Sequence, residues 1–291
     1  MSKPVLVYGV GVAGAATINF LLRQNIDVIA ADDHLNEMKH LELNKLGIEV
    51  VIAPSTNALR DLVANSEYVA PAPGIPENHP VILEALSQKK SLKTELDIAY
   101  EWESQRVGGP RPMLAVTGTD GKTTTVMMAE AILQAAGRSS IACGNTEVPL
   151  VEALDMQVDS FVVEASSFRL AFIESFRAEA SAWLNFDSDH LDWHESMKSY
   201  EEAKARLWRN VAAADTAIGV SGENAVMRHL QNVACRRRVV GGSGDYRTID
   251  GVLSGPQGVI IAESELSRSL PHDVVNALVA SALCIESGLA T

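Results

Sequence analysis

The chain has 291 residues, 47% of them hydrophobic, and its 37 acidic side chains exceed its 24 lysines and arginines, for a formal charge of −13. At about 150 residues per domain this length favours two domains, and the acidic balance argues against nucleic acid or an anionic membrane surface as a partner. Three scattered cysteines, without a CxxC pair, indicate neither a disulfide framework nor a thiolate zinc site, and no apolar stretch reaches the roughly 18 residues of a membrane span. We therefore expect a cytoplasmic protein.

The first predicted unit, residues 1–107, begins with a strand at 4–9, a glycine-rich turn and a helix over 15–24. Strand-like runs at 27–32 and 48–54 follow, with helix-like segments between them, which completes a βαβαβ pattern. This pattern predicts an α/β fold with a Rossmann-like, doubly wound parallel sheet. Residues 104–112 concentrate Gly, Pro and Arg without periodicity, as linkers do, and we place the domain boundary there.

The second predicted unit, residues 108–291, repeats this order with a strand at 113–117, the loop GTDGK and an apolar helix from about 123 to 136. We expect a central α/β domain of the P-loop ATPase type. The remaining predicted elements are strands at 160–165, 181–186 and 216–220, a hairpin over 248–263 and a helix over about 272–287 that ends at Gly288.

Gly9, Gly11 and Gly14 spell GxGxxG directly after the first strand, and Asp32 closes the second strand. This is the dinucleotide fingerprint, in which glycines let the backbone approach a pyrophosphate and the acidic residue accepts hydrogen bonds from ribose hydroxyls. NAD and other nucleotide diphosphates both fit it, and such a turn can also serve packing alone. Taken by itself, the fingerprint indicates an NAD-dependent oxidoreductase.

Residues 118–124, GTDGKTT, lie between a predicted strand and a predicted helix and form a shortened phosphate-binding loop, since Val116 stands where the full motif begins with glycine. Backbone N–H groups and the helix dipole would hold polyphosphate, Lys122 would neutralise it, and the Thr123 hydroxyl is placed to bind Mg²⁺. The alternative, a helix capped by Thr and Asp, needs neither the glycines nor the lysine.

Acidic and histidine side chains follow two later strands. Glu164 ends a buried strand, where a carboxylate faces the ligand crevice of a doubly wound sheet and suits a hard cation, although a structural ion pair is the alternative. The run NFDSDHLDWH suggests metal or phosphate chemistry, and we take His190 as its metal ligand. Asp192 and His194 we interpret as loop caps or solvated residues.

Two basic features carry less information. Lys204 lies on the helix-like stretch SYEEAKARLW, where a lysine is usually a solvated partner of an acid one turn away, so spacing alone does not single it out. We interpret the run from Arg236 to Arg238 as the solvent-exposed start of a strand, since it lacks the aromatic partners of a nucleic-acid site.

Seven motifs follow one another along the whole chain: GxGxxG, APAPGIPENHP, GTDGKTTT, GNTEVP, EASSFRL, NFDSDHLDWHESMKSYEEAKARLW and HDVVNAL. In these motifs and in their order the chain resembles the Mur ligase family. Within that family EASSF and Lys204 are most similar to the members that add D-glutamate to UDP-N-acetylmuramoyl-L-alanine, whereas the members that add L-alanine are expected to have an EADE-type strand end.

The resemblance implies an ATP-dependent amide ligase of peptidoglycan precursor synthesis, acting as a monomer, with ATP and two Mg²⁺ ions. The substrate carboxylate would attack the γ-phosphate, and the amine of D-glutamate would displace phosphate from the acyl phosphate. Such an enzyme has to align ATP, the substrate carboxylate and the UDP-sugar and to neutralise their negative charge, and it needs no protein nucleophile. In this family the lysine that matches Lys204 is carbamylated, which makes it a cation ligand.

The resemblance also assigns residues. Lys122, His190 and Lys204 would be catalytic, and Thr123, Glu164, His190 and Lys204 would serve the metals. The ATP residues would be Gly118, Thr119, Asp120, Gly121, Lys122, Thr123, Thr124 and, at the adenine, Asn276. The UDP-substrate residues would be Val12, Ala13, Asp32, Asp33, Ala72, Pro73, Gly74, Asn145 and Ser166.

The chain departs from the family pattern at the nucleotide contacts. Ala72 replaces a serine, Arg169 a glutamine, Asp33-His34 a hydroxyl residue followed by arginine, and Asp273 an asparagine. The chain also stops near the end of the second domain, so we expect the family's C-terminal domain, which supplies most of the D-glutamate pocket, to be absent and turnover to be poor. A nucleotide-binding remnant that no longer catalyses is a further alternative.

Overall fold

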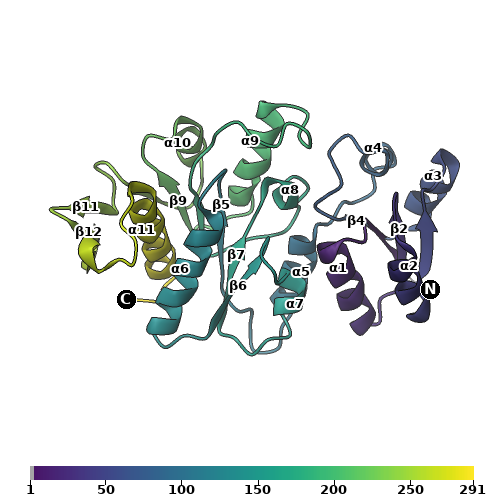
Figure 1. The fold of residues 1–291 in the computed structure, drawn as a ribbon, viewed down its shortest axis with the longest axis horizontal. Helices are drawn as coiled ribbons and strands as arrows, with labels where there is room; N and C mark the ends of the chain where they lie inside the picture. The colour runs from purple at the N-terminus through teal and green to yellow at the C-terminus, as the bar shows by residue number, and fades with distance from the viewer. Residues whose placement is uncertain (1–2) are drawn as a thin grey trace.

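The computed structural model describes residues 3–291, and all its helices and strands fall within two successive α/β units (Figure 1). The strands are β1 (Val5–Tyr8), β2 (Val28–Asp32), β3 (Glu49–Ile52), β4 (Val69–Pro71), β5 (Met113–Thr117), β6 (Ser140–Gly144), β7 (Ser160–Glu164), β8 (Ala180–Trp183), β9 (Thr216–Val220), β10 (Arg236–Val240), β11 (Arg247–Ile249), β12 (Val252–Gly255) and β13 (Gly258–Ala262). The helices are α1 (Val12–Arg23), α2 (Glu37–Lys45), α3 (Thr56–Asn65), α4 (Pro80–Ser87), α5 (Glu95–Ser104), α6 (Lys122–Ala135), α7 (Leu150–Ala153), α8 (Ser167–Leu170), α9 (Met197–Ala205), α10 (Asn224–Leu230) and α11 (Pro271–Glu286), with 3₁₀ turns η1 (Arg206–Trp208) and η2 (Glu263–Glu265).

The first unit is a parallel sheet of order β3-β2-β1-β4 with helices on both faces. Alternate residues of β1 enter different cores: Val5 and Val7 pack with α1, while Leu6 and Tyr8 pack with α3 and α4. A strand buried on both faces needs such a continuous apolar run, which is what the sequence supplies. The expected Rossmann-like sheet is confirmed.

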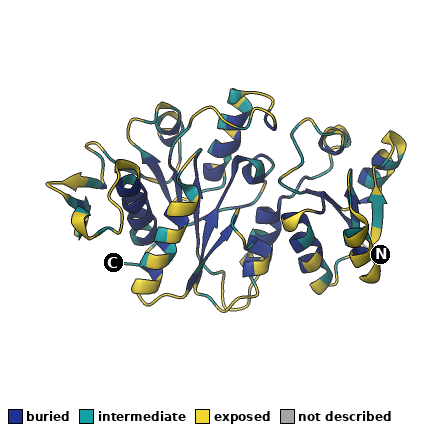
Figure 2. Cartoon of the chain, viewed as in Figure 1, coloured by how far each residue is buried: buried dark blue, intermediate teal, exposed yellow. Residues whose placement is uncertain are grey.

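The second unit is a parallel sheet of order β10-β9-β8-β5-β7-β6. Helices α6 and α11 cover one face, and α7 and α10 cover the other, so the sheet lies in the dark, buried interior of Figure 2. β5 lies between β7 and β8. Because the carboxyl ends of parallel strands meet at one edge of a sheet, the loops after β5, β7 and β8 converge there.

The structure differs from the sequence-based expectation in a few elements. α1 begins at Val12 rather than at residue 15. β4 and β6 complete the sheets without having been predicted, and β10 extends the start of a strand that was predicted at Arg236 to Arg238. The expected hairpin is β12 and β13, but β11 joins it to make a three-stranded antiparallel sheet. Within residues 3–291, none of the helices has the length and apolar character that crossing a bilayer requires.

Helix α5 joins the two units and packs on α7 of the second. Its N-terminus is fixed by a capping box between Thr94 and Asp97, and Asp97 also accepts hydrogen bonds from the backbone amides of residues 174–176. The boundary that we placed at residue 107 stays a prediction, with α5 lying at the junction.

Candidate active site

The phosphate loop runs from the end of β5 to the start of α6. Gly121 occupies the cap position of α6 with φ of 81°, in the left-handed region, and a Cβ there would lie 2.7 Å from Oδ1 of Asn276. The first N–H groups of α6 have no intrahelical acceptor, as at any helix N-terminus, and they lie at the positive end of the helix dipole. The loop therefore has the form of an anion site.

Asn185, just after β8, holds this loop in place and was not singled out from the sequence. Its Oδ1 accepts hydrogen bonds from the N–H groups of Thr119 at 2.8 Å and Asp120 at 2.9 Å, and its Nδ2 donates to the Asp120 carbonyl at 3.2 Å. These two amides are therefore occupied, and the free phosphate donors start at the helix. The only signal in the sequence is an asparagine directly after a buried strand.

Two lysines converge on the same loop carbonyl. Nζ of Lys122 donates to the carbonyl oxygens of Gly118 at 2.9 Å and Thr119 at 2.7 Å, and Nζ of Lys204 donates to that of Gly118 at 2.6 Å. Burial lowers the pKa of Lys122, and burial together with the charge of Lys122 lowers the pKa of Lys204 to about 7. The alternative interpretation of Lys204, a solvated partner of an acid on its own helix, is excluded because the residue is 1% exposed.

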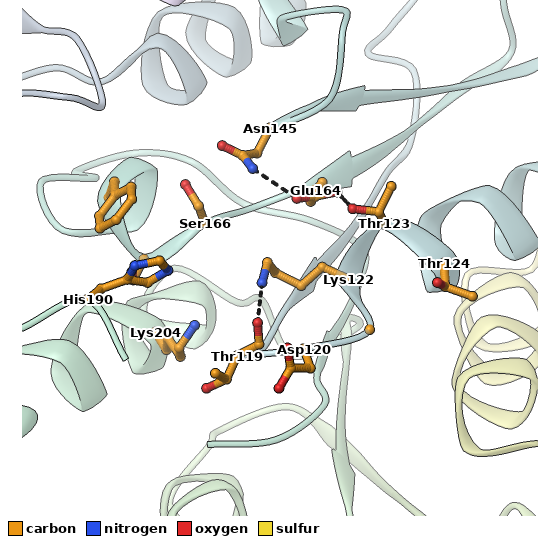
Figure 3. Close-up of a pocket in the computed structure, with 13 residues that line it drawn as sticks. Thr119, Asp120, Lys122, Thr123, Thr124, Asn145, Glu164, Ser166, His190 and Lys204 are labelled. Atoms are coloured by element: carbon orange, nitrogen blue, oxygen red, sulfur yellow. Dashed lines mark hydrogen bonds between the residues drawn. The ribbon is translucent and has the colours of Figure 1, made fainter. Parts of the chain in front are cut away.

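Glu164 links the phosphate loop to the loop after β6. One of its oxygens accepts from Oγ1 of Thr123 at 2.7 Å and the other from Nδ2 of Asn145 at 2.9 Å, as Figure 3 shows. Glu164 is 2% exposed, and its partners are a hydroxyl and an amide rather than a cation. Hydroxyl and carboxylate oxygens are the ligands that Mg²⁺ prefers, so these residues fit that ion.

A cavity of about 370 Å³ collects these side chains (Figure 3). His190 reaches it from the loop after β8 with its ring 4.6 Å from that of Phe168. No group of three or more His, Cys, Asp or Glu side chains within residues 3–291 forms a metal cage on its own. The lining consists of Thr119, Asp120, Gly121, Lys122, Thr123, Thr124, Asn145, Glu164, Ser166, Ser167, Phe168, His190 and Lys204.

A second cavity, of about 770 Å³, lies over the glycine-rich turn. A Cβ at Gly14 would lie 1.9 Å from the Gly9 carbonyl, so the turn requires glycine there. The Asp32 carboxylate lines this cavity and also accepts from the Val10 and His34 amides, which fixes the turn. The lining consists of Gly9, Gly11, Val12, Ala13, Asp32, Ala72, Pro73, Gly74, Ile75, Asn145, Thr146, Glu147 and Arg169.

Most predicted residues therefore fall into two groups, and Asn145 belongs to both cavities. Four predicted residues lie elsewhere. Gly118 precedes the residues that line the first cavity, and its carbonyl accepts from Lys122 and Lys204. Asp33 binds the Tyr8 hydroxyl and His79 rather than lining the second cavity, Ser166 lines the first cavity instead of the second, and Asn276 lies against Gly121. Their assigned ligand contacts stay predictions.

Two further side chains were misread or left without a role. His194, interpreted as a cap or solvated residue, has a fully buried side chain bonded to Ser167. Arg169, noted only as a departure, lines the second cavity and forms a buried ion pair with Glu95. The run from Arg236 to Arg238 does begin an exposed strand, as predicted, and two of its arginines pair with Glu286.

Comparison with known proteins matches both units to one family. Residues 116–284 match the Mur ligase middle domain, and residues 3–92 match the family described as Mur ligase MurD-like, N-terminal domain. A UDP-N-acetylmuramoylalanine–D-glutamate ligase from Frankia casuarinae is 35% identical over 303 residues, covering 98% of this chain and 61% of the relative. The corresponding ligase from Rhodococcus jostii is 34% identical and covers 99% and 59%.

A solved structure supports the fold. The UDP-N-acetylmuramate:L-alanyl-gamma-D-glutamyl-meso-diaminopimelate ligase from Neisseria meningitides superposes with a TM-score of 0.60 at 18% identity, covering 99% of this chain and 94% of that one. The class is thus a two-unit α/β protein with a phosphate loop, and the chain belongs to the Mur ligase family. It spans about 60% of the length of the curated relatives it matches.

Proposed function

We propose that the chain carries the nucleotide sites of a ligase that joins D-glutamate to UDP-N-acetylmuramoyl-L-alanine at the expense of ATP. The substrate carboxylate attacks the γ-phosphate, ADP leaves, and the amine of D-glutamate then displaces phosphate and loses a proton. The names and identities of the curated relatives support this reaction.

The shared position of Asn145 is the observation that carries the proposal. A UDP-substrate lying over the glycine-rich turn would reach the phosphate cavity past this side chain, which lines both cavities. The acceptor carboxylate and the γ-phosphate would then meet near Lys122, which neutralises anionic charge. An oxidoreductase would not need the lysine, threonine, glutamate and histidine side chains that line the phosphate cavity.

Thr123 and Glu164 would hold one Mg²⁺ and His190 a second. These ions would neutralise phosphate charge when bound. The roles of Lys122 and the first-turn amides of α6 do not depend on the metals, since they act directly on the phosphate oxygens. Ser166, whose hydroxyl is buried without a partner, would hydrogen-bond the substrate.

We also propose a carbamate on Lys204. The buried amine, with a pKa of about 7, is largely neutral at slightly alkaline pH and can attack CO₂, forming a C–N bond and releasing a proton. The product is an anionic oxygen ligand at a position where an ammonium could not bind a cation. Carbon-13 bicarbonate NMR tests this: a carbamate resonance that disappears in Lys204→Met is expected, and a plain amine under saturating bicarbonate contradicts it.

Titration of the 291-residue chain tests the nucleotide assignments. We expect separate binding of Mg-ATP and of UDP-N-acetylmuramoyl-L-alanine, and no binding of NADH. NADH binding with no response to the other two ligands would instead support the oxidoreductase. A chain of the relatives' length should release phosphate with D-glutamate and not with L-glutamate, which distinguishes the amine specificity from nucleotide binding.

A further inference from the structure

Three polar side chains form a bridge between the two units. Nδ1 of His194 lies 3.3 Å from Oε1 of Glu77, and Nε2 of the same ring lies 2.9 Å from Oγ of Ser167. Glu77 belongs to the loop between β4 and α4 of the first unit, whereas Ser167 and His194 belong to the second. The Glu195 backbone amide also donates to Oε2 of Glu77 at 3.4 Å, so His194 and Glu195 of the second unit meet the first unit at one carboxylate.

The environment of the bridge fixes the ring. The side chain of His194 has no exposed surface, and the rings of Trp193 and Tyr200 lie 4.5 and 5.1 Å from it. Burial tends to raise the pKa of Glu77, but the facing His194 ring and the Glu195 backbone amide, which donates to Oε2 at 3.4 Å, outweigh burial and lower it. Nδ1 faces the Glu77 carboxylate without forming a hydrogen bond, and the ring holds Ser167 through its other nitrogen, Nε2.

The bridge connects the two cavities. The loop that carries Glu77 begins with Ala72, Pro73 and Gly74, which line the larger cavity over the glycine-rich turn. At the other end Ser167 lines the phosphate cavity. The loop is also fixed to its own unit, because Nε2 of His79 lies 2.9 Å from the Asp33 carboxylate.

The order of serine, histidine and carboxylate also occurs in nucleophilic triads. Here Ser167 is 1% exposed, and the proposed ligase needs no protein nucleophile. The geometry therefore suits positioning better than attack on a substrate.

We propose that Glu77 and His194 are positioning residues that hold the loop of residues 72–79 against the phosphate cavity through Ser167, so that filling either nucleotide cavity strengthens binding in the other. The inference rests on the proposed function, because it takes the two ligands from it. Because the bridge touches a wall of each cavity, a ligand that restrains one wall would restrain the other through it, and the second ligand would then lose less conformational entropy on binding. Such coupling is reciprocal by linkage.

Calorimetry on the 291-residue chain measures the coupling directly. UDP-N-acetylmuramoyl-L-alanine is titrated with and without a saturating non-hydrolysable Mg-ATP analogue, and the reverse titration closes the cycle. In the wild type we expect the dissociation constant of each ligand to fall at least about fivefold when the other ligand is bound, which is the lower end of usual allosteric couplings. Glu77→Gln and His194→Gln should bring this factor close to one while both ligands still bind separately.

Matched variants separate the bridge from general effects. Glu195→Gln removes the same charge from an exposed neighbouring side chain but leaves the backbone amide that donates to Glu77, so it should keep the wild-type coupling. If Glu77 and His194 act as one unit, the double variant loses no more coupling than either single variant. Glu77→Gln alone suffices should the histidine variants fail to fold, since its side chain is partly exposed.

The outcomes distinguish the two proposals. A wild-type chain that binds neither ligand contradicts the proposed function. Binding of both ligands with no coupling, or coupling that persists in Glu77→Gln and in His194→Gln, overturns the bridge and leaves the proposed function standing.

Discussion

Asn185 determines which backbone groups of the phosphate loop remain free. Its Oδ1 accepts from two successive amides of the loop and so fixes the chain just before α6 begins. A single amide side chain thereby holds the loop in the shape that directs the helix N-terminus toward the cavity. Position in the fold, rather than a motif, gives this residue its role.

Removing that side chain should loosen the loop. We expect Asn185→Ala to lower the free energy of unfolding by about 1–3 kcal/mol, because the partly buried Thr119 amide and the exposed Asp120 amide lose their shared acceptor. Mg-ATP affinity should fall roughly tenfold, while UDP-substrate affinity stays unchanged. Urea unfolding and calorimetry measure the two effects. Asn232→Ala is the control, since this exposed side chain donates only to the Arg228 carbonyl of the preceding helix α10, and equal effects of the two variants would contradict the role of Asn185.

Lys204 should leave a pH signature in the stability. In the folded chain its pKa falls from 10.5 to about 7, so between these values the unfolded chain binds more protons and the free energy of unfolding rises with pH. In CO₂-free buffer we expect a gain on the order of 1–2 kcal/mol between about pH 7.5 and about pH 9. Lys204→Met should remove this gain, whereas Lys198→Met, at an exposed lysine of the same helix, should keep it. Parallel curves for wild type and Lys204→Met would refute the shift.

What the sequence could predict of the site depended on distance along the chain. Lys122 and Thr123 were identifiable because a local motif contains them, and Glu164 because it ends a buried strand. His194 and Asn185 could not be assigned, since their partners are 27 or more residues away and only the fold brings them together. Resemblance to the family, rather than spacing, singled out Lys204.

At the scale of elements, the contact between α6 and α11 shapes the phosphate loop. Asn276 of α11 lies so close to Gly121 that no Cβ fits without movement. Strands β1, β5 and β9 were predictable as continuous apolar runs, because a parallel strand buried on both faces needs one. β4 was not, since it has only three residues and ends in proline, and β10 opens with three arginines that only its position at the sheet edge permits.

Gly121→Ala should separate backbone strain from steric contact. Gly137 has a similar φ of 77°, but a Cβ there would meet no atom within 4 Å. Gly137→Ala therefore measures the cost of the left-handed conformation alone, a loss of about 1–2 kcal/mol in the free energy of unfolding. We expect Gly121→Ala to cost at least about 1 kcal/mol more in urea unfolding, as overpacking does. Adding Asn276→Ala should recover that difference. An equal loss of unfolding free energy at the two glycines would show that α11 moves away from the new Cβ without a measurable penalty.

At the scale of the whole molecule, α5 ties the first sheet to the second. Glu95, in its first turn, accepts a hydrogen bond from the Val151 amide of α7 at 2.8 Å and pairs with Arg169 of α8. Both charged side chains are buried, and Arg169 also lines the cavity over the glycine-rich turn. The pair thus connects the junction of the two units to the wall of the proposed UDP-substrate site.

Replacing only one member of the Glu95–Arg169 pair should lower the free energy of unfolding far more than replacing both members. Arg169→Met leaves the Glu95 carboxylate buried without a cation, and we expect a loss of about 3–5 kcal/mol in the free energy of unfolding. Glu95→Met in the same chain removes the uncompensated charge and should restore much of that stability, because desolvation of the pair offsets its attraction.

An exposed ion pair provides the comparison for urea unfolding. Lys198 and Glu202 lie one turn apart on α9 with largely exposed side chains, so Lys198→Met should change stability by less than about 1 kcal/mol. If Arg169→Met costs no more than this control, the buried pair does not brace the junction. A double variant less stable than Arg169→Met alone would mean that Glu95 acts through the Val151 amide of α7 rather than through the arginine.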